Sequence, residues 1–112
     1  MTLYIDASNS EKIKVGVDED ILVEDAREEK SQRLLGMIQS TLREKKISLN
    51  DITKIEVHLG PGSFTGLRVG VVIANALGWL LGVSVNGKDI NKDGSLEPVY
   101  SQVSTNVVPN VF

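Results

Sequence analysis

The chain contains no cysteine and a single histidine, His58. A disulfide framework is therefore impossible, and a zinc site has few ligands to draw on. The longest apolar run is interrupted by an asparagine and glycines, and the amino-terminal residues lack the charged and then apolar pattern of a signal peptide. We expect a cytoplasmic protein with no membrane segment, no metal and no cofactor.

An excess of basic residues is also missing, because the formal net charge is −3. Contacts from lysine and arginine to phosphates supply most of the affinity for nucleic acid. We therefore do not expect the protein to bind RNA directly, and any tRNA contact is expected to be indirect. A chain of 112 residues with 41% hydrophobic residues can bury one modest core. We predict one globular domain.

The spacing of apolar residues predicts the element order β-β-β-α-β-α-β. The expected elements are strands at 3–6, 12–17 and 21–25, a helix at 28–45, a strand at 54–59, a helix at 64–81 and a strand at 83–85. A loop at 86–98 and a further strand at 99–108 follow. The first three strands form an antiparallel meander in a mixed sheet, with both helices able to pack on one face. This order matches a ribonuclease H-like or actin-like (ASKHA) half-domain, although order alone leaves several α/β folds open.

The helix expected at 64–81 is apolar almost all round. Small residues recur every four positions along one stripe, at Gly66, Gly70, Ala74 and Gly78. Such a stripe lets another backbone approach closely. A helix that is apolar nearly all round is covered nearly all round. Either the rest of the monomer provides this cover, or a partner chain does.

The narrow polar arc of this helix is the predicted partner interface. It carries Arg68 and Asn75 together with the large apolar residues Val72 and Trp79. Large apolar groups rimmed by polar residues mark interaction sites. On the helix at 28–45, one apolar strip suffices for the sheet and leaves a second, flanking strip. The predicted interface residues of that strip are Leu34, Met37 and Thr41.

The stretch GPGSFTGLRVG, residues 60–70, joins a strand to a helix. Free N–H groups and the helix dipole favour an anion at such a turn. However, a P-loop requires Gly-Lys followed by Ser or Thr, and the dinucleotide fingerprint requires a closer glycine spacing. We predict a structural loop, in which glycines permit unusual dihedral angles, a proline stiffens the turn and a serine caps the helix. Its residues are Gly60, Pro61, Gly62, Ser63 and Gly66.

Asp6 ends the first strand, next to Ala7 and Ser8. Actin-like ATPases keep a phosphate or magnesium loop at this position. An ATP-binding enzyme that uses Asp6 and the glycine loop is therefore the alternative interpretation, beside a simple turn-capping aspartate. No nucleophile, base and orienting group can be assembled from the sequence, so we expect no catalytic residue.

Several stretches together resemble the TsaB family, also called YeaZ, the accessory proteins of tRNA threonylcarbamoyladenosine synthesis. They are YIDAS, KSQRLLGMIQSTL, SLNDITKIEVHLGPGSFTG, the loop GPGSFTGLRVG and GVSVNG. The resemblance predicts one lobe at 1–88 and an extension at 89–112. Family members are about twice as long, with a second lobe that is absent here. They usually carry His-Ser-Glu where this chain has Lys30, Ser31 and Gln32.

The resemblance implies a non-catalytic subunit that pairs through its two helices with a TsaD-like transferase, which carries the metal and the chemistry of the t6A modification. Family members also pair with themselves through the same surface. The sequence leaves open a heterodimer with the transferase and a homodimer through the helices at 28–45 and 64–81. The ATP-binding enzyme remains the alternative function.

Overall fold

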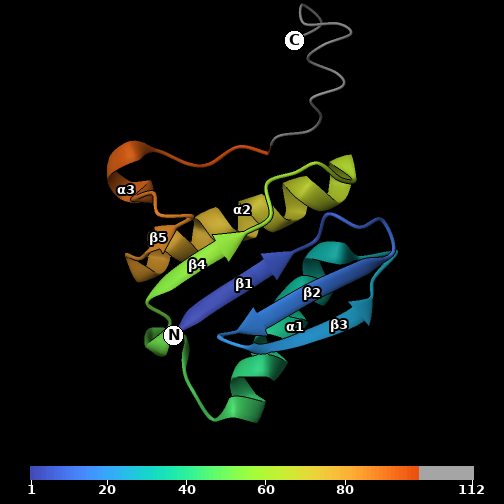
Figure 1. Ribbon diagram of the computed structural model, residues 1–112, viewed down its shortest axis with the longest axis horizontal. Helices are drawn as coiled ribbons and strands as arrows, with labels where there is room; N and C mark the ends of the chain where they lie inside the picture. Colours follow the sequence, from blue (N-terminus) through green and yellow to red (C-terminus); the bar gives the residue numbers. More distant parts are fainter. Residues whose placement is uncertain (99–112) are drawn as a thin grey trace, which may run out of the picture.

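The computed structural model describes residues 1–98, which form one sheet with two long helices (Figure 1). The strand expected at 99–108 lies outside the described residues. The elements are β1 (Thr2–Asp6), β2 (Lys12–Val17), β3 (Asp20–Asp25), α1 (Lys30–Lys45), the short 3-10 helix η1 (Leu49–Asp51), β4 (Lys54–Val57), α2 (Phe64–Leu81), β5 (Ser84–Val85) and α3 (Ile90–Asp93).

The five strands lie in the order β3-β2-β1-β4-β5. β1, β2 and β3 form an antiparallel meander, whereas β4 pairs parallel with both β1 and β5. Parallel neighbours need crossover connections, and these contain α1 and α2. The expected mixed α/β sheet is therefore confirmed, and the expected elements follow one another in the expected order.

Both long helices cover the same face of the sheet and contact each other (Figure 1). Alternate strand residues point into this layer, so Leu3, Ile5 and Val15 are buried while Tyr4 faces the other side. The core consists of these inward residues and the inner sides of the helices. Among residues 1–98, no long helix covers the opposite face of the sheet.

The small-residue stripe of α2 lies against the chain's own sheet. A Cβ atom added at Gly66 would lie 1.9 Å from the carbonyl oxygen of Ala7, and one added at Gly78 would lie 2.4 Å from Cγ2 of Val85. These positions leave no room for a side chain, so glycine sets the separation between helix and sheet. α2 ends at Gly82, which has a left-handed φ of 68°.

α2 is the one helix among the described residues that is long and apolar enough to cross a membrane, with 18 residues, a mean hydropathy of 1.5 and 44% of them buried. Length and composition alone do not separate a core helix from a membrane helix. The glycine contacts with Ala7 and Val85 are those of a core helix, packed on a sheet.

Two helices differ from the sequence prediction. α1 begins at Lys30 rather than at residue 28, because Glu29 has a left-handed φ of 54° that the helix cannot continue. The loop expected at 86–98 contains α3, which starts where the Asp89 carboxylate accepts hydrogen bonds from the N–H groups of Asn91 and Lys92. A four-residue helix has too few residues for a periodic apolar pattern, so periodicity could not predict it.

Replacing Gly66 with alanine tests the close approach of α2 to β1. The new methyl group would meet a backbone carbonyl, and we expect the free energy of unfolding to fall by about 1–3 kcal/mol. Gly36, also inside a helix, is the matched control because nothing lies within 4 Å of its added Cβ. Gly36→Ala should raise stability by about 1 kcal/mol through helix propensity. Urea denaturation measures both, and equal effects of the two changes would contradict the packing described.

Candidate functional site

One side of α2 faces away from the sheet and carries large exposed side chains. The exposed fractions are 62% for Val72, 61% for Trp79 and 69% for Leu80. Most members of this surface recur every four residues, so each is a surface neighbour of the next along the helix. We call it the outer stripe of α2, and it consists of Phe64, Arg68, Val72, Ala76, Trp79 and Leu80.

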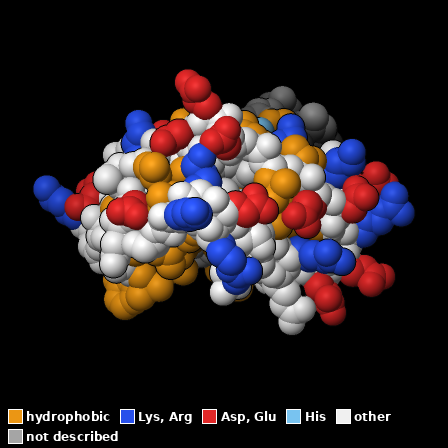
Figure 2. Space-filling model, turned by 90° about the horizontal axis from the view of Figure 1, so that it is seen from below, with side chains coloured by type: hydrophobic (Ala, Val, Ile, Leu, Met, Phe, Trp, Pro, Cys, Tyr) orange, Lys and Arg blue, Asp and Glu red, His pale blue; other side chains and the backbone are white. Residues whose placement is uncertain are grey.

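The outer stripe combines apolar groups with one cation. The Arg68 guanidinium lies 5.5 Å from the centroid of the Phe64 ring, which is within the range of a cation–π contact. Figure 2 shows hydrophobic side chains gathered at its lower left, at the end of the molecule where Figure 1 places the carboxyl-terminal part of α2.

The prediction of an interface strip on the first helix is wrong. Leu34, Met37 and Thr41 are only 0%, 3% and 7% exposed, and they lie in the core. The buried side of α1 is wider than expected and follows the spacing i, i+3, i+4, i+7 and i+8, which is typical of a helix that packs on a sheet. Its residues are Leu34, Met37, Ile38, Thr41 and Leu42. Leu35 of the same helix is exposed.

The Asn75 side chain forms hydrogen bonds within the chain, to the backbone of Leu96. Its Nδ2 atom donates to the carbonyl oxygen of Leu96 at 2.9 Å, and its Oδ1 atom accepts from the N–H of Leu96 at 3.0 Å. A hollow of about 340 Å³ lies between α2 and the segment 96–98, with Arg68 and Val72 in its wall. Of the predicted interface residues, the structure thus exposes Arg68, Val72 and Trp79 together.

Sequence reasoning missed two members of the outer stripe, Phe64 and Leu80. Both continue the four-residue repeat that runs through Arg68 and Val72, and this repeat is a signal that the sequence contains. The sequence left open whether the monomer or a partner covers Leu80, and it was not among the predicted interface residues. It is exposed because it lies opposite the glycine stripe that contacts the sheet.

The amino-terminal ends of α1 and α2 lie side by side. Ser31 of α1 lines a hollow of about 500 Å³ together with Thr65 and Val69 of α2. Lys30, at the start of α1, is buried, and its amine donates to the carbonyl oxygen of Asn9 at 2.8 Å. The first turn of α1 and the first turns of α2 therefore border the same hollow.

The glycine loop lies directly on the turn that follows β1. A Cβ atom at Gly62 would lie 2.5 Å from the Cβ of Ser8, and the N–H of Ser63 donates to the carbonyl oxygen of Ser8 at 2.6 Å. Ser63 is the N-cap of α2, and its hydroxyl accepts from the N–H of Gly66 at 3.4 Å. The peptide bond between Gly60 and Pro61 is cis. The inner side of the loop is therefore filled by protein.

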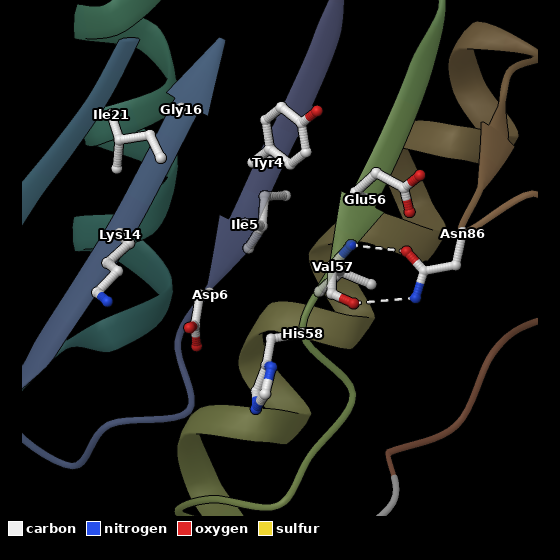
Figure 3. A pocket seen from close by; sticks show the side chains of 10 residues that line it. All are labelled: Tyr4, Ile5, Asp6, Lys14, Gly16, Ile21, Glu56, Val57, His58 and Asn86. Carbon is white, nitrogen blue, oxygen red and sulfur yellow. Dashed lines mark hydrogen bonds between the residues drawn. The ribbon is translucent and has the colours of Figure 1, made fainter. Parts of the chain in front are cut away.

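Asp6 ends β1 at one edge of a hollow of about 340 Å³ on the open face of the sheet (Figure 3). Its carboxylate accepts hydrogen bonds from the N–H of Ser8 at 2.9 Å and from the Ser8 hydroxyl at 2.5 Å. Burial raises the pKa of Asp6, but these hydrogen bonds and the nearby charges of His58 and Lys14 outweigh it, so the pKa lies below its usual value.

Two further polar side chains around this hollow, His58 and Asn86, contact the backbone. His58 Nε2 lies 3.0 Å from the carbonyl oxygen of Pro61, and the Asn86 side chain forms two hydrogen bonds with the backbone of Val57 (Figure 3). Residues 1–98 contain no group of three or more histidine, aspartate and glutamate residues that could hold a metal ion. The side chains of Tyr4, Lys14 and Glu56 also line the hollow (Figure 3).

Comparison with known proteins places these features in a family. Residues 19–87 match the family model described as TsaD: tRNA N6-adenosine threonylcarbamoyltransferase. A Bacillus subtilis protein named tRNA threonylcarbamoyladenosine biosynthesis protein TsaB is 32% identical over 81 residues, which cover 62% of this chain and 34% of that protein. The Escherichia coli protein of the same name is 47% identical over 49 residues, which cover 44% of this chain and 21% of the relative. The chain thus spans about a third or less of these relatives.

Solved structures agree with the sequence matches. YeaZ from Pseudomonas aeruginosa superposes with a TM-score of 0.65 at 28% identity, covering 75% of this chain and 41% of that chain. An uncharacterized protein with similarity to peptidase YeaZ from Pseudomonas aeruginosa superposes with a TM-score of 0.66, covering 96% of this chain and 49% of that one. At 22% identity, this second likeness supports the fold alone.

The hydrogen bonds of Asp6 predict a specific response to acid. Because its pKa is lowered from 3.8, ionised Asp6 contributes stability that is fully present above about pH 3.8 and is lost as the pH falls through the lower, folded value. Asp6→Asn should flatten this part of the profile of unfolding free energy against pH, measured by urea denaturation. The control is Asp25→Asn, which makes the same charge change at an exposed strand end. Identical profiles for the wild type and Asp6→Asn would refute this role for the ionised carboxylate.

Proposed function

Because the chain belongs to the TsaD threonylcarbamoyltransferase family, and within it to the TsaB (YeaZ) proteins, we propose that it is a non-catalytic accessory subunit in the synthesis of tRNA threonylcarbamoyladenosine. It pairs through α2 and the adjoining side of α1 with a TsaD-like transferase, or with a second copy of itself. The transferase carries the metal and the chemistry. Any tRNA contact is indirect, and the protein acts in the cytoplasm.

The outer stripe of α2 carries this proposal. Val72, Trp79 and Leu80 are each more than half exposed on one helix. Complete burial of a side chain such as valine or leucine is worth about 1.5–3 kcal/mol, so a partner that covers these residues gains substantial free energy. Contiguous apolar surface on a helix, next to a cation such as Arg68, is typical of a protein interface.

The surface continues onto α1 at Leu35. This exposed residue lies one helical turn after Ser31, which borders the same hollow as the start of α2. Two neighbouring helices with exposed apolar residues present ridges and grooves that fit a second pair of helices. Leu35 therefore replaces Leu34, Met37 and Thr41 as the contribution of α1 to the proposed interface.

An accessory role fits the side chains that residues 1–98 provide for metal binding and for contact with tRNA. The structure shows no group of three or more histidine, aspartate and glutamate residues among them that could hold a metal ion, and the glycine loop is packed against Ala7 and Ser8. The net charge of −3 also provides no basic surface for tRNA. A subunit that supplies contact area to a catalytic partner needs neither feature.

We also propose that residues 1–88 form one half of a two-lobed, actin-like fold, with residues 89–112 as an extension. The mixed sheet with two helices on one face and the partial coverage of both YeaZ structures support this division. Pairing with a transferase or with a second copy would place another folded unit against the helix layer.

Val72→Asp tests the interface at the centre of the outer stripe. A carboxylate that must lose its water at this apolar position should weaken association tenfold or more, by at least about 1.4 kcal/mol, while leaving the fold intact. The matched control is Val23→Asp, which adds the same charge to the exposed, opposite face of the sheet.

Size-exclusion chromatography with light scattering measures the association of each chain, alone and mixed with a TsaD-like transferase from the same source. Circular dichroism verifies that each variant is folded. We expect the wild type and Val23→Asp to form the same complex and Val72→Asp to form less of it. A wild-type chain that remains monomeric under both conditions would overturn the proposed function, and equal association of the two variants would overturn the assigned surface.

A further inference from the structure

The sheet has an open edge at β3. In the order β3-β2-β1-β4-β5, β3 is the outermost strand, and among residues 1–98 no further strand lies beside it (Figure 1). The strand at the other edge, β5, has two residues, whereas β3 has six. The backbone of a long edge strand is a template on which a further strand can pair.

Alternate residues of β3 direct their backbone groups away from β2. In an antiparallel pair, every second residue exchanges hydrogen bonds with the neighbouring strand. The N–H of Ala26, directly after β3, donates to the carbonyl oxygen of Glu11 at 2.7 Å, so the residues at even positions are the ones bonded to β2. The backbone N–H and C=O groups of Ile21, Val23 and Asp25 therefore point outward, to where a further strand would pair.

The helix face of this edge is hollowed along α1. A hollow of about 300 Å³ lies between the start of β3 and the end of α1. A second hollow, of about 250 Å³, lies between Glu24 of β3 and the earlier turns of α1. Gly36 lines this second hollow, and nothing lies within 4 Å of a Cβ atom added to it. An added strand would thus find room between its own backbone and α1 for side chains on this face.

The two faces of β3 differ in chemistry. On the open face of the sheet, the exposed fractions are 61% for Ile21 and 46% for Val23. On the helix face, Glu24, Glu29 and Glu44 line the two hollows. A strand added at this edge would therefore meet apolar groups on one face and carboxylates on the other.

The surroundings of β3 are acidic. Residues 18–29 contain seven acidic residues and one arginine, although the net charge of the whole chain is only −3. The basic residues Arg33 and Lys45 also line the hollows, but Lys45 is in an ion pair with Asp20. Two copies of β3 side by side would bring two such acidic segments together, and like charges on adjacent strands destabilise pairing. A basic segment is therefore a better occupant than a second copy.

We propose that β3 accepts an extended segment of another protein as a further strand of the sheet, and that apolar residues alternate in this segment with lysine or arginine. Side chains of a strand point alternately to the two faces of a sheet. The apolar residues lie beside Ile21 and Val23, and the basic residues lie beside Glu24 with their stems along α1. This edge is separate from the outer stripe of α2, so the inference does not rest on the proposed function.

A peptide in which valine and lysine alternate over the length of β3 tests the proposal. Its control contains the same residues as a block of valines followed by a block of lysines. The control has equal charge, but it cannot place valines on one face and lysines on the other. Fluorescence anisotropy measures the binding of each labelled peptide to the full chain. We expect the alternating peptide to bind about tenfold more tightly, and equal affinities would overturn the proposal.

Amide hydrogen exchange, measured by NMR, identifies the backbone groups that the peptide pairs with. When the alternating peptide binds, exchange should slow at Ile21, Val23 and Asp25, whereas Leu22 and Glu24, whose N–H groups point to β2, should change little. Binding without protection at the three outward residues would overturn the proposal. Protection without peptide, together with a dimer in light scattering, would identify a second copy as the occupant and would also overturn it.

Variants test the backbone and the charge separately. Val23→Pro removes an outward N–H and no hydrogen bond to β2, a position where an edge strand tolerates proline. It should weaken binding of the alternating peptide about tenfold. Glu24→Lys should weaken this binding about fivefold, whereas its matched control Asp93→Lys, at an exposed position of α3, should have no effect.

Circular dichroism verifies that each variant is folded. If Val23→Pro does not fold, the comparison of Glu24→Lys with Asp93→Lys and the exchange of the wild type still decide the outcome. Unchanged binding by a folded Val23→Pro, or equal binding by Glu24→Lys and Asp93→Lys, would overturn the proposal.

Discussion

The contact of Gly66 with the carbonyl of Ala7 sets the arrangement of the helix layer, because no side chain fits between α2 and the end of β1. The small residues of α2 must face the sheet, and residues two positions away in sequence then lie on the opposite side of the helix. Val72 and Leu80 are therefore exposed as a consequence of how α2 is seated. One packing constraint produces both the core and the surface that we propose for pairing.

The parts of the fold that follow from local spacing could be predicted from the sequence. The four-residue repeat of small side chains predicted a close backbone contact, and the alternating strands predicted the meander. The orientation of α1 could not be predicted in the same way, since two overlapping apolar strips share one spacing. Thr41 looks like a surface residue, but its hydroxyl donates to the carbonyl of Met37 at 2.7 Å, and this bond lets it be buried.

Only part of the candidate interface was predicted, because the sequence does not show how α2 is rotated about its axis. Val72 and Trp79 stand out because large apolar residues interrupt a polar arc, whereas Leu80 resembles any other leucine of an apolar helix. Its exposure depends on the rotation of α2 about its axis, which is set by tertiary contacts at Gly66 and Gly78. The hydrogen bonds of Asn75 depend on α3 and the segment after it, which have no periodic signal.

Asn75 and Asn86 use their side-chain amides in the same way, each donating to and accepting from the backbone of one other residue. Such a side-chain amide makes the two hydrogen bonds that the backbone of a neighbouring strand would otherwise make with that residue. It recognises the peptide group and makes no demand on the side chain of its partner. The position of residue 96 beside α2 is therefore compatible with many different side chains at that residue. The sequence of the extension can change while its backbone stays bonded to Asn75.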